Sequence, residues 1–217
     1  MKHSSEFILL ASTRVGESSL VMHALSPQWG RRSFITGLGK ASRPSLFLPL
    51  SLLEGEVTEN PRSELWRAGR LSAVVPLTGL RSDVRKNAMT AFISEVLYRS
   101  LREGTLEEGL YGWCRGCILT LDALESDFAN FHLRFLLEFA GALGFSPTLE
   151  DLAPFAGEHF GVLRELLAAD GLTSFLLVPM NGEQRSAVAS LLLDYISFHS
   201  GTRLQIRSLP VLRELFK

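Results

Sequence analysis

The first eighty residues contain short apolar runs, separated by turn residues such as Gly16 and Gly30, with the spacing of strands rather than helices. The last of these runs alternates, with Leu71, Ala73 and Val75 on one face and Arg70, Ser72 and Val74 on the other. We predict five strands, over residues 7–12, 19–25, 31–37, 51–57 and 69–75. Five short strands in so short a stretch are typical of a small closed barrel such as an OB-fold. Several runs are apolar on both faces, so we expect another part of the chain to cover the barrel wall.

From Ser82 onward the apolar positions follow the 3.6-residue period of helices. Ser82 or Asp83 is the expected N-cap of the first helix, Thr105 that of the second, and Gly144 is expected to end the third. Helices are predicted over residues 82–101, 105–124, 128–145 and 183–200, with at least one further helix within 149–171 and a last one beginning near Pro210. Segment 128–145 is apolar nearly all round and should be central in a helical bundle.

The two patterns together predict an α+β fold. An N-terminal five-stranded OB-fold barrel, residues 1–79, is expected to pack on a C-terminal all-helical domain, residues 80–217. The chain has no apolar run long enough to span a bilayer, and its N-terminal apolar stretch is too short for a signal peptide. We therefore expect a cytoplasmic protein.

Basic residues gather locally on a chain whose formal net charge is only −1. Residues 1–80 carry nine Lys or Arg against six Asp or Glu, whereas residues 81–217 carry thirteen against seventeen. One acid-free stretch holds four of the basic residues: Arg31, Arg32, Lys40 and Arg43. Such a patch on a nearly neutral protein indicates phosphate binding, and chance charge on a solvated loop is the alternative.

The same stretch, SPQWGRRSFITGLGKASRPS, is not a nucleotide-binding P-loop. A P-loop needs a glycine five residues before Gly39, where Phe34 stands, and a hydroxyl after Lys40, where Ala41 stands. A phosphate bound by this stretch would therefore not be that of a nucleotide in a P-loop.

Candidate catalytic and metal-binding groups are sparse. The two cysteines, Cys114 and Cys117, are spaced as two zinc ligands, but zinc needs four, and a pair of small buried residues is the simpler interpretation. The five histidines show no metal-type spacing, and no nucleophile motif is present. We expect neither an enzyme nor a cofactor.

Four segments, in order along nearly the whole chain, resemble the RecO recombination-mediator family. The segment ILLASTRVGESSLVMHALSPQWGRRSFITGLGKASRPS resembles the family's N-terminal barrel, and LRFLLEFAGALGFSPTLEDL resembles its central helix, which ends in a Leu-Gly-Phe-x-Pro step. The segments ELWRAGRLSAVVPLTGLRSDVRKNAMTAFISEVLYRSLREG and RSLPVLRELF resemble the barrel-to-helix join and the closing segment.

The resemblance implies a bacterial, nucleoid-associated, non-catalytic protein of DNA repair and recombination. It would bind single- and double-stranded DNA, anneal strands, and act with RecR and the single-stranded-DNA-binding protein SSB to load recombinase. Many members carry a four-cysteine zinc site after the Leu-Gly-Phe-x-Pro step, but this chain has no cysteine there, so we expect no zinc. Region 148–182 should instead be held by apolar packing of Phe155, Phe160, Leu163, Leu166, Phe175 and Leu176.

With this resemblance, residues 26–45 are interpreted as a barrel hairpin and a basic loop that face a nucleic-acid backbone. The expected DNA-binding residues are Arg14, Arg31, Arg32, Lys40, Arg43, Arg70, Arg81, Arg85 and Lys86. Trp29, Phe34 and Trp66 are candidates for base stacking, with core packing as the alternative. The competing hypothesis is a protein-interaction scaffold whose barrel does not bind DNA.

The helical half is expected to hold a groove for the acidic, apolar tail of SSB. Arg134 is the expected anchor for a tail carboxylate, because it is the only cation of an apolar helix. Pairing of Arg134 with Glu138 one turn on is the alternative, and Arg203 or Arg207 could serve as the anchor instead.

Overall fold

A computed structural model describes residues 2–39 and 44–217. The chain divides into two compact units, and each draws on two stretches of sequence. The first comprises Met1–Thr78 and Ser94–Leu119, and the second comprises Gly79–Ile93 and Thr120–Lys217.

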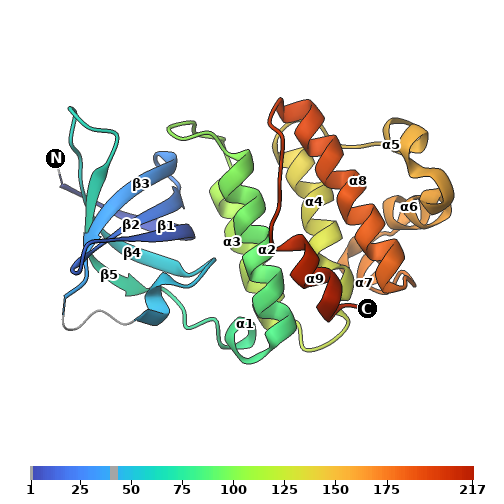
Figure 1. Cartoon of the computed structure of the whole chain (residues 1–217), viewed down its shortest axis with the longest axis horizontal. Coiled ribbons are helices and arrows are strands. Elements are labelled where there is room, and N and C mark those ends of the chain that lie inside the picture. Colours follow the sequence, from blue (N-terminus) through green and yellow to red (C-terminus); the bar gives the residue numbers. More distant parts are fainter. Residues whose placement is uncertain (1, 40–43) are drawn as a thin grey trace. The chain divides into compact units, whose positions relative to one another are not determined.

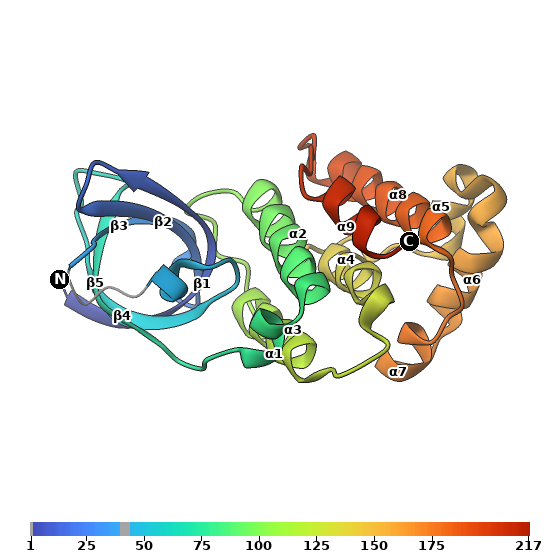
Figure 2. The same cartoon turned by 60° about the horizontal axis from the view of Figure 1, so that its bottom comes forward.

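Five strands of the first unit form a closed barrel (Figure 1): β1 (Lys2–Val15), β2 (Ser19–Ser26), β3 (Gly30–Gly37), β4 (Leu52–Thr58) and β5 (Trp66–Ala73). The strand order is β1-β2-β3-β5-β4, with β4 returning to β1, and Figure 2 shows the strands curving round to close the ring. All pairs are antiparallel except β3 with β5. This arrangement confirms the predicted five-stranded OB-type barrel.

The first strand closes the barrel because it pairs with two neighbours in turn. Its residues Lys2–Ile8 pair with β4, and its residues from Ile8 to Val15 pair with β2, with a shift of register between Leu9 and Ala11. A bulge bends a strand locally, which lets one strand serve both sides of a small barrel. Strand β1 is therefore much longer than the predicted 7–12.

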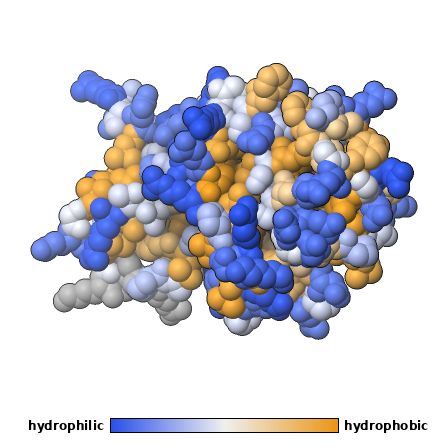
Figure 3. Space-filling view, turned by 45° about the vertical axis from the view of Figure 1, so that its right-hand side comes forward, coloured by the Kyte–Doolittle hydropathy of each residue, from blue (hydrophilic) through white to orange (hydrophobic). Residues whose placement is uncertain are grey.

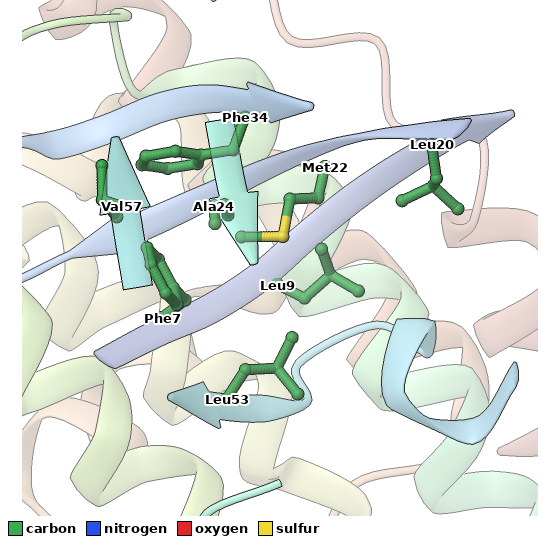
Figure 4. Packing of buried hydrophobic residues seen from close by; sticks show 9 residues of the cluster. Phe7, Leu9, Leu20, Met22, Ala24, Phe34, Leu53 and Val57 are labelled. Carbon is green, nitrogen blue, oxygen red and sulfur yellow. The ribbon is translucent and has the colours of Figure 1, made fainter. Parts of the chain in front are cut away.

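Alternate residues of the strands fill the barrel. Phe7 and Phe34 meet edge to face with 5.1 Å between ring centroids. The buried cluster consists of Phe7, Leu9, Leu20, Met22, Ala24, Phe34, Leu53, Val57 and Ala68 (Figure 4). Burial of a side chain of the size of Phe or Leu contributes roughly 1.5–3 kcal/mol.

The opposite face of β1 is also covered. Ile8 and Leu10 point away from the barrel interior and are nevertheless buried. The hydroxyl of Ser94, in helix α2 (Val84–Ser100), donates a hydrogen bond to the carbonyl oxygen of Leu10. The expected second cover of the barrel wall is thus supplied by residues 94–119.

The remaining elements are helices, as predicted. They are η1 (Pro44–Phe47), α1 (Thr78–Ser82), α2, α3 (Leu110–Ala123), η2 (Phe128–Asn130), α4 (Phe131–Ala142), α5 (Leu149–Ala156), η3 (Gly157–His159), α6 (Phe160–Ala168), α7 (Gly171–Leu176), α8 (Gly182–Ser200) and α9 (Leu209–Leu215). No helix among these described residues is long and apolar enough to cross a membrane.

Helix α4 is the central helix of the second unit. Seven of its twelve residues are buried, and it packs against α7 and α8 (Figure 2). It ends as expected, because Gly144 has a φ of 92° and the Phe145 amide donates to the Ala140 carbonyl at 3.0 Å. The prediction that segment 128–145 is central is confirmed.

One predicted helix boundary is wrong. The second helix begins at Leu110 rather than Thr105, because residues before it form turns and Gly109 has a φ of 77°. The stretch 149–171, predicted to hold at least one helix, holds α5 and α6, because Gly157 with its φ of 50° ends α5 before α6 begins. Of the two N-caps considered for the first helix, Asp83 is correct, since its carboxylate accepts from the Arg85 amide at 2.7 Å.

The break at Gly157 also corrects the predicted packing of region 148–182. Leu163, Leu166, Phe175 and Leu176 are buried as predicted. Phe155 and Phe160, however, are 74% and 39% exposed. A single helix would have kept one apolar face throughout, whereas two short helices present Phe155 on the outside.

Candidate nucleic-acid interface

Arg31 is the second residue of strand β3 and has an internal role. Its Nη1 donates to the carbonyl oxygen of Leu101 at 2.8 Å, directly after the end of α2. Its guanidinium lies 4.4 Å from the ring centroid of Tyr98 and 4.0 Å from the Glu103 carboxylate, and its side chain is only 14% exposed. The last carbonyls of a helix carry partial negative charge, so a cation is favourable there. Arg31 therefore fixes β3 to the end of α2.

Arg32 points to the other face of β3 and meets aromatic rings. Its guanidinium lies 3.9 Å from the ring centroid of Trp66, at the start of β5. Trp66 in turn meets Trp29, in the β2–β3 turn, at 5.4 Å between centroids, and Trp29 lies 6.1 Å from His3. Trp29 and Trp66 pack against the barrel core on one side and are partly exposed. We call Trp29, Arg32 and Trp66 the barrel-end cluster.

Phe34, the third stacking candidate, is fully buried in the barrel core. His23 adds no positive charge beside Arg31, because the pKa of its imidazole is lowered. Burial is the larger cause of this shift, and the charge of Arg31 is the second. Its Nδ1 forms a 2.8 Å hydrogen bond with the Ser33 hydroxyl. Arg32 is thus the group that brings positive charge to the aromatic rings.

Arg14 lies near the other end of β3. Arg14, on β1, stands opposite Leu20 of β2, and Leu20 stands opposite Thr36 of β3. Thr36 lies five residues, or about 16 Å, along the strand from Arg31. Arg14 is exposed, and its guanidinium donates to the Glu17 carbonyl at 3.1 Å. Lys40 and Arg43 lie outside the described residues, so Arg31 and Arg32 are the described members of the four-residue patch.

Arg70 is the remaining predicted site residue of the barrel. It is exposed on β5 at a φ of 54° and pairs with the Glu56 carboxylate at 2.6 Å. An exposed ion pair of this kind is worth at most about 1 kcal/mol, so a phosphate can compete for the guanidinium.

Three predicted DNA-binding residues belong to the second unit. Arg85 is exposed and pairs with Asp83 at 3.3 Å. Burial lowers the pKa of Arg81, and the nearby Asp122 carboxylate opposes this shift. Lys86 is only 4% exposed, and its ammonium donates to the carbonyl oxygens of Asp122, at 3.1 Å, and Leu124. Lys86 therefore joins two helix ends rather than offering its charge to a ligand.

Arg134, the expected anchor for an acidic tail, has an intrahelical partner. Its Nε donates to the Glu138 carboxylate at 2.5 Å, and its guanidinium lies 5.4 Å from the ring centroid of Phe175. The one-turn pair considered as the alternative is thus present. The two alternative anchors, Arg203 and Arg207, are both exposed.

The cysteine pair is part of helix α3. Cys114 is buried, and this burial raises the pKa of its thiol well above the ordinary value. Within residues 2–39 and 44–217, no three His, Cys, Asp or Glu side chains are arranged to hold a metal ion.

Sequence reasoning missed the residues that hold Arg31 in place. Tyr98 and Glu103 lie about seventy positions further along the chain, and Glu103 also accepts from the Ser33 amide at 2.8 Å. No local pattern signals such a distant contact.

The closed barrel with the β1-β2-β3-β5-β4 order, followed by a helical region, places the chain among OB-fold proteins that carry a helical C-terminal part. The family described as "Recombination protein O C terminal" matches residues 81–153. The chain is 28% identical to the DNA repair protein RecO of Bacteroides fragilis and 29% identical to that of Phocaeicola vulgatus, each over 96% of this chain and 97% of the relative. It is 26% identical to the DNA repair protein RecO of Flavobacterium psychrophilum over the full length of both. The chain is thus similar to RecO DNA repair proteins over nearly its whole length.

Proposed function

We propose that this protein is a non-catalytic recombination mediator of the bacterial cytoplasm and nucleoid. In this role it binds single- and double-stranded DNA, anneals complementary strands and helps to load recombinase on DNA coated with SSB. Residues 1–79, together with Arg81 and Arg85, would bind the nucleic acid, and the rest of residues 80–217 would contact protein partners. Similarity to RecO DNA repair proteins over nearly the whole chain supports this general role, and the barrel-end cluster suggests where DNA would bind.

The observation that carries DNA binding is the stack of Arg32 on Trp66, 3.9 Å from cation to ring centroid. OB-folds bind single strands by stacking bases on aromatic rings, with cations beside them for the phosphates. Because Trp29 and Trp66 are anchored on the barrel core, they are ordered before a strand arrives. A rigid aromatic surface costs little conformational entropy on binding.

Phosphate contacts would come from exposed or partly exposed cations of each unit. On the barrel these are Arg14 and Arg70, which are exposed, and Arg32, which is partly exposed; on the second unit Arg85 is exposed. Arg81, Lys40 and Arg43 remain part of the proposal. Arg31 and Lys86 would stabilise the fold rather than contact phosphate, because both side chains already donate hydrogen bonds to backbone carbonyl oxygens.

Partner binding follows from the family resemblance. A RecR-like protein and the acidic tail of SSB are the proposed partners. To bind the tail, Arg134 would have to leave the Glu138 carboxylate and pair with a carboxylate of the tail. Both interactions are charge-assisted hydrogen bonds of similar strength. Calorimetric titration of a tail peptide into wild type, Arg134→Ala and Arg203→Ala identifies the anchor. If both variants bind as tightly as wild type, neither arginine is the anchor.

The proposal is tested by adding the purified protein to labelled single-stranded and duplex oligonucleotides. We expect saturable binding of both at low salt, and faster annealing of complementary strands than without protein. The competing function is a scaffold that contacts only proteins. Binding of the SSB tail without any binding of DNA would favour that scaffold.

A further inference from the structure

Helices α5 and α8 form a groove on the second unit, with a volume of about 930 Å³. Leu152 and Phe155 line it from α5, and Leu191, Tyr195 and Phe198 line it from α8. On α8 the lining residues recur every three or four positions from Ala187 to Phe198. This stripe runs for about 16 Å along the helix, or three turns.

The groove is bordered by exposed aromatic side chains. Phe198 and Phe155 are 81% and 74% exposed, more than any other large hydrophobic side chain in the described part of the chain. Figure 3 brings this side of the chain forward and shows hydrophobic residues at the surface among hydrophilic ones. A single exposed apolar residue is ordinary, but two that border one groove mark a surface with a binding role.

The aromatic residues of α8 also contact one another. His199 lies 4.3 Å from Tyr195 and 5.2 Å from Phe198, measured between ring centroids, and it stacks on Phe145 at 5.3 Å. Side chains held in this way lose little freedom when a ligand binds.

The charge of the groove is acidic. Asp194 is exposed on α8, between Leu191 and Phe198, and Asp151 begins the wall formed by α5. The Asp151 carboxylate accepts from the backbone amide and the hydroxyl of Thr148 at 2.9 and 2.7 Å, which favours its ionised form. Among the residues that the structure describes, no Lys or Arg lines the groove, and His199 is the one basic group there. DNA and an acidic tail would both meet like charge at this surface.

We propose that this groove binds an amphipathic helical segment of another protein, about three turns long, with Lys or Arg beside its apolar face. Apolar side chains at positions i, i+3, i+4 and i+7 of that segment would enter the groove. Its basic residues would pair with Asp194 and Asp151. The occupant therefore differs in charge from the SSB tail, and this interaction is independent of DNA binding.

The test uses a synthetic helical peptide of about twelve residues with Leu at the four apolar positions and Lys on either side. A matched peptide carries Glu in place of Lys. Both are titrated by anisotropy into wild type, Phe198→Ser and Asp194→Lys. The control variants Val84→Ser and Glu165→Lys make the same kinds of change at exposed positions away from the groove. Thermal unfolding of each variant checks that it stays folded.

We expect the Lys peptide to bind wild type one to one, and the Glu peptide to bind at least about tenfold more weakly. Phe198→Ser and Asp194→Lys should each weaken the Lys peptide by about tenfold or more, while the two controls bind like wild type. Equal binding of the two peptides, or equal binding by groove and control variants, would overturn the proposal. It is also overturned if wild type dimerises in sedimentation and Phe198→Ser does not, because the groove would then hold a second copy of the chain.

Discussion

The α-carbon of Gly30 packs directly against the carbonyl oxygen of Thr105, so closely that a β-carbon at Gly30 would lie 1.9 Å from that oxygen. Beside this contact the Gly104 amide donates to the Arg31 carbonyl at 2.8 Å, and Glu103 accepts from the Ser33 amide. The pairing of β3 with β5 begins only at Phe34, which leaves the first residues of β3 at an edge. Residues 103–105 cover that edge and satisfy its backbone groups.

We predict that Gly30→Ala destabilises the protein by about 3 kcal/mol or more. The substitution adds a steric clash with a backbone atom to the strain of a side chain at a φ of 61°. Gly16→Ala is the matched control, because Gly16 has a φ of 66° but open space around it, and should cost about 1 kcal/mol. Urea unfolding measures both. Equal losses would show that residues 103–105 do not pack on β3 as described.

Arg31 and Arg32 are adjacent, but their removal should have different consequences for stability. Arg31→Ala loses the bond to the Leu101 carbonyl and the contact with Tyr98, which we expect to cost about 1–3 kcal/mol. Arg31→Lys should not restore the loss, because a compact ammonium cannot reproduce both contacts. Arg32→Ala should cost about 1 kcal/mol or less, the value of a partly exposed cation–π contact. A larger loss for Arg32→Ala than for Arg31→Ala would contradict these roles.

Stability should fall in acid partly because of His132. This imidazole is buried between Phe92 and Phe216, and burial first, with Arg185 second, lowers its pKa from 6.5 to about 3. The folded state therefore keeps His132 neutral, whereas the unfolded state takes up a proton below about pH 6.5. The resulting loss approaches roughly 1.4 kcal/mol per pH unit as pH falls from 6.5 toward 3.

Replacing His132 by Phe should flatten this pH dependence. The free energy of unfolding, measured in urea between about pH 6 and 4.5, should fall less steeply with acid in His132→Phe than in wild type, by up to one proton. His132→Gln, which also carries no titrating group, should behave in the same way. Parallel pH profiles for wild type and both variants would show that His132 is protonated in the folded state.

Periodicity was sufficient to predict the barrel and the central helix, because their apolar positions repeat with the pleat or the helical turn. It could not predict that Phe155 is exposed. Gly157, which ends α5, lies two residues after Phe155, and the apolar pattern of the sequence does not change there. The opposite directions of Arg31 and Arg32 follow from strand geometry. Their partners, Leu101 and Trp66, are set by the tertiary fold.

The sequence is equally unable to show which charged side chains are buried, and Lys86 is an example. It stands in a basic run with Arg85, and sequence alone suggests that both face solvent. The structure instead places the Lys86 ammonium on two carbonyl oxygens at the end of α3 and the turn after it. A buried cation of this kind is identified only when the acceptors that solvate it are known.

The central claim is that the barrel end binds single-stranded DNA through Arg32 and Trp66. It is tested most directly by the affinity for a labelled single-stranded oligonucleotide, measured over a series of salt concentrations. Wild type should show a negative slope of log affinity against log salt, and Arg32→Ala should flatten that slope by about 0.7. Trp66→Ala should keep the slope and lower the affinity by roughly five- to a hundredfold, the effect of losing one stacked base. Arg164→Ala, which removes an exposed cation from α6, should match wild type. No binding by wild type at low salt, or identical slopes and affinities in all four proteins, would contradict the claim.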